Sequence, residues 1–223
     1  MKTVHDQNLS FWSPQPYFIG AFFFPQQIIQ LVWLYKLWKG QGTKEELAEM
    51  TDYVAIYASG NACIGSWSRA VCCSPPLKHT QLYKGAEADW TLPTLKTSNI
   101  FVTINTVAQL AYVATRLRRM NTAFQNFILT HIAAKTFAGI GILDFLHNTS
   151  SAYFVGEGPS TWVKALTGVG FAAAVVTSDW ILGSCLVYHL VALTCGQEGS
   201  WRALLAAYAA GTAAIVGVKN WVK

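Results

Sequence analysis

The chain has 223 residues, of which 52% are hydrophobic and only 12% are charged. An ordinary soluble domain carries about 25% charged residues, so this composition excludes that class and predicts a polytopic membrane protein. The net charge of +5 is spread over several loops. Such a distribution favours contact with phospholipid head groups and argues against nucleic acid as a partner.

Six apolar stretches are each long enough for the roughly 20 residues that a helix needs to cross the hydrocarbon core. No repeat or linker divides them, so we expect one all-α domain over residues 1–223, a transmembrane bundle of six spans. The first sixteen residues are polar and lack the apolar region of a cleavable signal peptide. The first span is therefore expected to direct insertion, into the endoplasmic reticulum membrane. In chain order the stretches are Tyr17–Trp38, Asp52–Cys72, Ser98–Leu117, Ala123–Leu146, Trp162–Cys195 and Leu204–Val222.

Polar side chains recur within the first three spans, and in a membrane such groups tend to face the bundle interior. In the first span they follow Pro25, whose ring and missing N–H predict a kink that frees a backbone carbonyl. In the third span they recur at steps of three and four, which predicts one helical stripe. They either form a polar pocket or simply join neighbouring helices. The residues are Gln26, Gln27 and Gln30, then Asn61, then Asn99, Thr103, Asn105, Thr106 and Gln109.

Two ionisable side chains each lie near the middle of an apolar run. Lys135 lies within Phe124–Phe145, and Asp179 lies within Val169–Val191. A central lysine costs about 2.5–3.5 kcal/mol on insertion scales, so a partner or a wet cavity is expected. We therefore expect Lys135 to meet Asp179, with His131 one turn away. The pair is either a functional site or an ion pair that fixes helix packing.

The fifth stretch is much longer than a bilayer requires. As one helix, Trp162–Cys195 would be about 50 Å long, so it must tilt, protrude or break. Gly168 and Gly170 are the expected break points. The stretch has no turn sequence long enough to predict two separate spans. A seventh element, if present, would lie in the polar segment His147–Thr161.

Several kinds of chemistry have no signature in this chain. It has no Gly-rich phosphate loop, HExxH, GxSxG or DDxxD motif, and its five cysteines lack metal-ligand spacing. Neither a metal nor a cofactor is therefore expected. Acid-initiated chemistry on a lipophilic substrate fits better, because burial pushes a carboxyl group towards its neutral, proton-donating form. Aromatic rings would stabilise the resulting carbocation in a dry pocket. The candidate rings are Phe22, Phe23, Phe24, Tyr53, Tyr57, Trp67, Phe137 and Trp180.

In size, number of spans, aromatic content and isolated intramembrane acids, the chain resembles the small integral-membrane terpene cyclases of fungal meroterpenoid biosynthesis. It lacks the glutamate of that group's Asn-Leu-Ala-Trp-Glu-type stretch, so it would belong to a divergent branch. The segment His131–Asp144 is the first candidate for that branch's own signature. The resemblance implies an isomerase of secondary metabolism that cyclises prenyl chains attached to aromatic or pyrone cores.

The cyclase hypothesis gives each candidate residue a role. Asp179 is the expected proton donor, and Lys135 or His131 sets its protonation state. A salt bridge to Lys135 would keep Asp179 ionised, and in that case Asp144 or Asp52 becomes the better acid. Asn105 or Gln109 is expected to orient the polar head of the substrate. The full set of expected substrate-binding residues is Gln26, Gln30, Asn61, Asn105, Gln109 and Trp180.

Two other classes of function are open on sequence alone. A proton-coupled small-molecule transporter would use Lys135, Asp179 and His131 as a relay during alternating access, although the two halves of the chain show no inverted repeat. A non-catalytic membrane scaffold would use the same polar groups only to join helices. Turnover by purified protein separates the enzyme from both. The sequence does not predict an oligomeric state.

Overall fold

The computed structural model describes residues 9–72 and 92–221, with side chains throughout except at 67–72 and 92–94. This part of the chain contains seven α-helices and no strand, so the predicted all-α class is confirmed. The helices are α2 (Pro16–Trp38), α3 (Lys44–Cys72), α4 (Leu92–Thr115), α5 (Gln125–Tyr153), α6 (Thr161–Thr177), α7 (Trp180–Gly196) and α8 (Gly199–Trp221).

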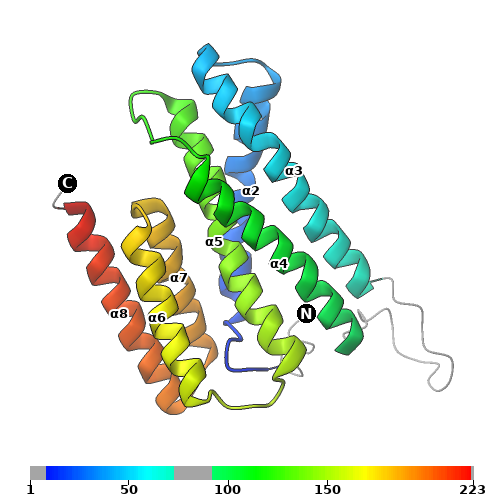
Figure 1. The fold of residues 1–223 in the computed structure, drawn as a ribbon, viewed down its shortest axis with the longest axis vertical. Coiled ribbons are helices and arrows are strands. Elements are labelled where there is room, and N and C mark those ends of the chain that lie inside the picture. Colours follow the sequence, from blue (N-terminus) through cyan, green and yellow to red (C-terminus); the bar gives the residue numbers. More distant parts are fainter. Residues whose placement is uncertain (1–8, 73–91, 222–223) are drawn as a thin grey trace.

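Helix α5 lies at the centre of the bundle. It packs against α2, α3 and α4 on one side and against α7 on the other, between the two groups of helices seen in Figure 1. Helices α4 and α5 are antiparallel, and two hydrogen bonds fix their register. Ser98 donates to Asn148 at 3.2 Å, and Thr106 donates to the carbonyl of Gly141 at 2.8 Å. This central position lets α5 contribute side chains to several interfaces.

Three of the described helices, α2, α5 and α8, are long and apolar enough to cross a membrane. Helices α6 and α7 are apolar but shorter. Large apolar side chains such as Phe24, Leu31 and Val169 lie exposed on the outside of the bundle. A helical bundle is therefore confirmed, and membrane insertion is supported by three helices, while the number of spans stays a prediction.

The fifth apolar stretch does break, but not at the glycines where the sequence predicts it. Trp162–Cys195 forms two helices, and the chain breaks at Asp179, not at Gly168 or Gly170. Asp179 is the N-cap of α7, where its carboxylate accepts the backbone N–H of Leu182 at 3.1 Å. An N-cap needs one residue of extended backbone with a short polar side chain, so no long turn sequence is required.

The seventh helix therefore comes from this break and not from the segment His147–Thr161. Helix α5 continues through His147 and ends at Tyr153, and α6 begins at Thr161. The residues between them contain turns but no helix of their own.

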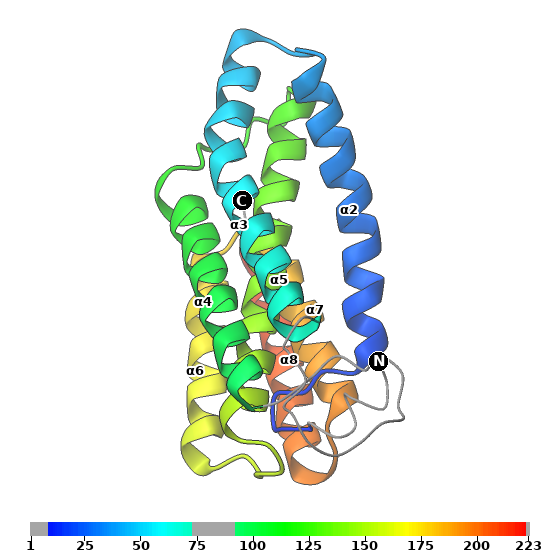
Figure 2. The same cartoon turned by 90° about the vertical axis from the view of Figure 1, so that its right-hand side faces the viewer.

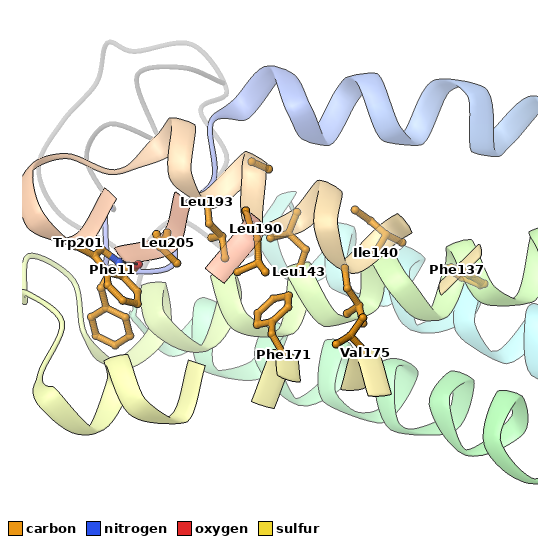
Figure 3. Packing of buried hydrophobic residues seen from close by; sticks show 13 residues of the cluster. Phe11, Phe137, Ile140, Leu143, Phe171, Val175, Leu190, Leu193, Trp201 and Leu205 are labelled. Atoms are coloured by element: carbon orange, nitrogen blue, oxygen red, sulfur yellow. Dashed lines mark hydrogen bonds between the residues drawn. The ribbon is translucent and has the colours of Figure 1, made fainter. Parts of the chain in front are cut away.

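Residues 9–15 form a segment that crosses one end of the bundle, as the dark blue trace in Figure 2 shows. Ser10 donates to Ser150 of α5 at 2.6 Å, and the indole N–H of Trp201 of α8 donates to the carbonyl of Phe11 at 2.7 Å. Figure 3 shows Phe11 beside Trp201 at the end of the apolar core that joins α5, α6, α7 and α8. The segment is therefore anchored to α5 and α8.

The α2–α3 and α4–α5 loops meet at the opposite end of the bundle (Figure 1), where charged residues gather. Glu46 accepts the backbone N–H of Asn126 at 3.0 Å, and Glu49 pairs with Arg118 at 3.4 Å. These contacts join the start of α3 to the start of α5 and to the loop before it. This end is the more polar one and lies outside the apolar stretch that begins at Asp52.

Thr43 and Glu46 form a capping box at the start of α3, and its loss has a predictable effect. The N–H of Thr43 donates to Glu46 at 2.8 Å, and the N–H of Glu46 donates to Thr43 at 3.3 Å. The bond from the Thr43 N–H lowers the pKa of Glu46. We expect Glu46→Ala to lower the free energy of unfolding by about 1 kcal/mol at neutral pH. The pKa of Glu46 is lower in the folded state than in the unfolded state. The stability that Glu46 contributes is therefore fully present above the unfolded-state pKa and is lost as the pH falls through the folded-state pKa.

Thermal unfolding of both proteins at neutral pH and at about pH 3 measures this difference. The gap between wild type and variant should narrow at the acidic pH. Glu45→Ala, which removes an exposed neighbour, is the matched control and should leave the unfolding temperature nearly unchanged. Equal stability of the two variants at neutral pH would contradict the role given to Glu46.

Candidate functional site

Lys135 and Asp179 form an ion pair, as expected from the sequence. The Lys135 ammonium donates to Asp179 Oδ2, and its Nζ atom lies 2.7 Å from Nδ1 of His131. An ammonium can only donate, so Nδ1 of His131 accepts and its proton is carried by Nε2. The side chain of Lys135 is 10% exposed and that of Asp179 is 29% exposed. A chain of hydrogen bonds therefore leads from the buried His131 to the partly exposed Asp179.

Local structure explains how these three groups meet. His131 and Lys135 are one turn apart and so share a face of α5. Asp179 is brought to them by the break between α6 and α7. Lys219 of α8 donates to the carbonyls of Val176 and Ser178 at the end of α6, where the carbonyls of a helix C-terminus favour a cation. Lys219 thereby holds the break that positions Asp179.

The bonds to Asp179 suit a carboxylate and not a proton donor. Its two oxygens accept from the Leu182 N–H and from the Lys135 ammonium. Both oxygens therefore act as hydrogen-bond acceptors in this arrangement. The arrangement therefore favours Asp179 as a proton acceptor or as a stabiliser of positive charge, in contrast to the donor role expected from the sequence.

An apolar cavity of about 370 Å³ lies among α4, α5, α6 and α7. Val107 and Leu166, in walls on opposite sides, are 61% and 65% exposed, so the cavity opens sideways between α4 and α6. None of its lining residues is titratable. They are Trp12, Thr103, Thr106, Val107, Leu110, Ile142, Phe145, Leu146, Leu166, Thr167, Gly170, Phe171, Ala174 and Leu186.

One end of this cavity points along α5 and α6 towards the ion pair, whose residues are not part of the lining. Ile142 in its wall is two turns from Lys135 on the same face of α5. The Thr106–Gly141 hydrogen bond sets the register of α4 against α5. In that register the wall residue Leu110 of α4 lies at the height of Phe137 of α5, and Phe137 is about half a turn along α5 from Lys135. On α6, the wall residue Ala174 precedes Asp179 by little more than one turn. The pair is thus placed beyond the end of the cavity nearer the α6–α7 break.

No protein-family model, curated protein or solved structure matches this chain. Its function is therefore inferred from the arrangement of its own side chains.

None of the predicted site residues lines the cavity, and Asp52, Asn61, Trp180 and Asp144 take no part in the ion pair either. Asp52 is exposed at the charged end, 4.0 Å from Arg116. Asn61 is exposed and donates to a carbonyl of its own helix at 2.9 Å, and Trp180 is exposed at the start of α7. Asp144 is half-buried, and its carboxyl group has no hydrogen-bond or ion-pair partner among residues 9–72 and 92–221. Of these four residues, Asp144 remains a candidate acid, because its carboxyl group is half-buried and unpartnered among the described residues.

The polar residues of the third span do not form a single stripe. Thr103 and Thr106 line the cavity, but Asn105 and Gln109 turn towards α3. Gln109 accepts the hydroxyl of Tyr53 at 2.9 Å, donates to a backbone carbonyl of α3 at 3.1 Å and donates to Asn105 at 3.4 Å. Steps of three and four drift around a helix over several turns, which explains the divergence. Asn105 and Gln109 therefore join two helices instead of facing the cavity.

Gln26 and Gln30 of α2 turn inward, whereas Gln27 is exposed, and α2 also packs against a buried histidine that no sequence motif marks. Gln30 accepts the hydroxyl of Tyr57 at 3.3 Å, whereas Gln26 is 3% exposed with no partner for its amide among the described residues. His189 of α7 is fully buried, packs its ring 5.7 Å from Phe22 and likewise has no described partner. An isolated histidine in an apolar stretch is the signal that could have identified it.

None of the predicted aromatic residues is among those that line the cavity. The rings of Tyr57 and Phe137 lie 5.8 Å apart between α3 and α5. Phe24 and Trp180 are exposed on the outside, and the side chain of Trp67 lies outside the described residues. Within the described ranges, no three His, Cys, Asp or Glu side chains gather in a way that could hold a metal ion.

Proposed function

We propose that the protein is an integral membrane enzyme that binds a lipophilic substrate in the α4–α7 cavity and cyclises its prenyl chain. The observation that carries this proposal is an apolar cavity that opens sideways between helices, with an ion pair further along α5 beyond the wall residue Ile142. Its volume of about 370 Å³ falls in the usual range for small-molecule sites. A substrate dissolved in the lipid phase would enter between α4 and α6 without crossing water.

The membrane arrangement that suits this proposal has seven crossings, one more than the six expected. Helices α6 and α7 have 17 residues each. At 1.5 Å per residue each is about 25 Å long, close to the roughly 30 Å of a hydrocarbon core. The endoplasmic reticulum stays the expected location, which imaging of a tagged full-length chain would test.

The ion pair offers a balanced acid–base cycle for an isomerisation. Lys135 gives its proton to the oxygen of an epoxide, the C–O bond breaks, and alkene carbons of the prenyl chain attack the carbocation in turn. A proton then leaves the final cation from carbon and passes to the Asp179 carboxylate. The Lys135–Asp179 hydrogen bond returns that proton to Lys135, so the pair is restored without a further reactant. Trp12, Phe145 and Phe171 would stabilise the cation by about 0.5–2 kcal/mol each.

Filling the cavity tests this proposal directly. Gly170 lines the cavity, and a Cβ atom built on it meets no atom within 4 Å, so the backbone there accepts the Cβ of the Gly170→Phe side chain. We expect cyclisation of an epoxidised prenyl-phenol by membranes containing the variant to fall about tenfold or more. Chromatographic retention time is the readout, because an isomerisation leaves the mass unchanged.

Gly211→Phe is the matched control, since Gly211 is an exposed glycine of α8 whose added Cβ also meets nothing within 4 Å. It lies outside the cavity lining and should keep full activity. Undiminished cyclisation by Gly170→Phe, or none by the wild type, would refute the proposal.

Proton-coupled transport is the second candidate, and the hydrogen-bonded chain of His131, Lys135 and Asp179 favours it. Such a chain can change protonation as access alternates. Repeating the cyclisation assay with detergent-purified protein separates the two functions, because purified protein turns over substrate only if it is an enzyme.

A further inference from the structure

The cavity has a second end, and the side chain found there is that of Trp12. Trp12 belongs to the segment 9–15 that crosses the end of the bundle. It is part of the cavity lining, and its indole N–H donates to the hydroxyl of Thr167 at 3.0 Å. Thr167 is buried on α6 and donates in turn to the carbonyl of Val163 at 2.7 Å.

The position of Trp12 follows from the residues around it. On α5 the cavity wall ends at Leu146, and one turn further Ser150 accepts the hydroxyl proton of Ser10. On α6 the wall begins at Leu166, more than two turns before the break at Asp179. Trp12 therefore lies at the end of the cavity remote from the ion pair.

The backbone on either side of Trp12 is fixed. Phe11 packs its ring 5.5 Å from Phe154 and accepts the Trp201 indole N–H at 2.7 Å, and Figure 3 shows Phe11 beside Trp201. The N–H of Gln15 donates to the carbonyl of Ala192 at 3.0 Å. The backbone beside Trp12 is therefore held in place, and rotation of the indole away from the cavity would break its hydrogen bond to Thr167.

We propose that Trp12 is the floor of the cavity and sets the longest prenyl chain that the protein accepts. This inference rests on the proposed function. The volume of the cavity also indicates the length of the prenyl chain. An apolar cavity of about 150 Å³ holds the six carbons of benzene. By that measure, 370 Å³ holds roughly fifteen carbons, which corresponds to a farnesyl chain.

A series of prenylated phenols that differ by one isoprene unit tests the inference on the detergent-purified full-length protein. Binding is measured by native mass spectrometry with the compounds in competition. The wild type should prefer the farnesyl compound. Trp12→Ala should move the preference to the next longer chain, with a change of about tenfold or more in the ratio of the two bound species.

Two variants separate the size of the indole from its hydrogen bond. Trp12→Phe keeps an aromatic ring but removes the N–H, and Thr167→Val removes the acceptor. Both should keep the preference of the wild type. Leu146→Phe narrows the same end of the cavity and should move the preference to a shorter chain, which keeps the inference testable if Trp12→Ala does not fold.

The outcomes distinguish this inference from the proposed function. If the wild type binds no prenyl-phenol of any length, the proposed function fails. If the wild type shows a preference for one length, and neither Trp12→Ala nor Leu146→Phe changes it, then only the role of Trp12 is overturned.

Discussion

Removing the Lys135 ammonium while Asp179 stays in place is expected to destabilise the protein strongly. Breaking a buried ion pair by removing one partner costs about 3–5 kcal/mol, because the other charge is left uncompensated. The side chain of Asp179 is 29% exposed, so we expect Lys135→Met to fall at the lower end of that range. Thermal unfolding in detergent micelles measures the change.

The double variant Lys135→Met with Asp179→Asn removes both charges and keeps a good N-cap residue for α7. It should recover most of the lost stability while remaining inactive in cyclisation. Arg116→Met is the matched control, because it breaks the exposed pair with Asp52 at 4.0 Å, and such pairs contribute at most about 1 kcal/mol. If Lys135→Met is no less stable than Arg116→Met, the pair does not hold α5 to α7.

A single methyl group at Gly139 is expected to force α5 and α7 apart. A Cβ atom built on Gly139 lies 2.8 Å from Cβ of Cys185 and 3.2 Å from its sulfur. The backbone fixes the position of both Cβ atoms, so rotation of a side chain cannot relieve the clash. We expect Gly139→Ala to lower the free energy of unfolding by about 1–3 kcal/mol, the usual cost of overpacking.

Adding Cys185→Gly to this variant removes the opposing Cβ and should restore part of the lost stability. Gly170→Ala is the control, since an added Cβ there meets nothing within 4 Å. Its effect should be neutral or slightly stabilising, as alanine favours helix. A Gly139→Ala protein as stable as Gly170→Ala would show that the two helices are not in close contact at this point.

The ion pair could be predicted from the sequence because isolated charges in apolar runs need partners, and this chain offers few. The geometry of the pair could not be predicted, because the sequence places Asp179 in the middle of an apolar run, whereas in the structure Asp179 caps a helix. Hydropathy is averaged over about 20 residues, so a two-residue break within an apolar stretch does not change the signal.

The cavity was harder still to foresee. Its walls are leucine, isoleucine, phenylalanine and threonine side chains that would serve equally well in a packed core. A void depends on how four helices and a distant terminal segment fit together, and no local pattern encodes that fit. The polar residues of the third span are a partial signal, because two of them, Thr103 and Thr106, line the cavity.

The anchoring of residues 9–15 has a consequence for biosynthesis. Phe11 and Ser13 are translated well before Trp201 and Gln197, from which they accept hydrogen bonds. The segment that carries Trp12 can therefore be fixed in place only after α8 has been made. Contacts between such distant parts of a chain form late. Until then, the nascent protein would hold an open-ended channel instead of a closed pocket.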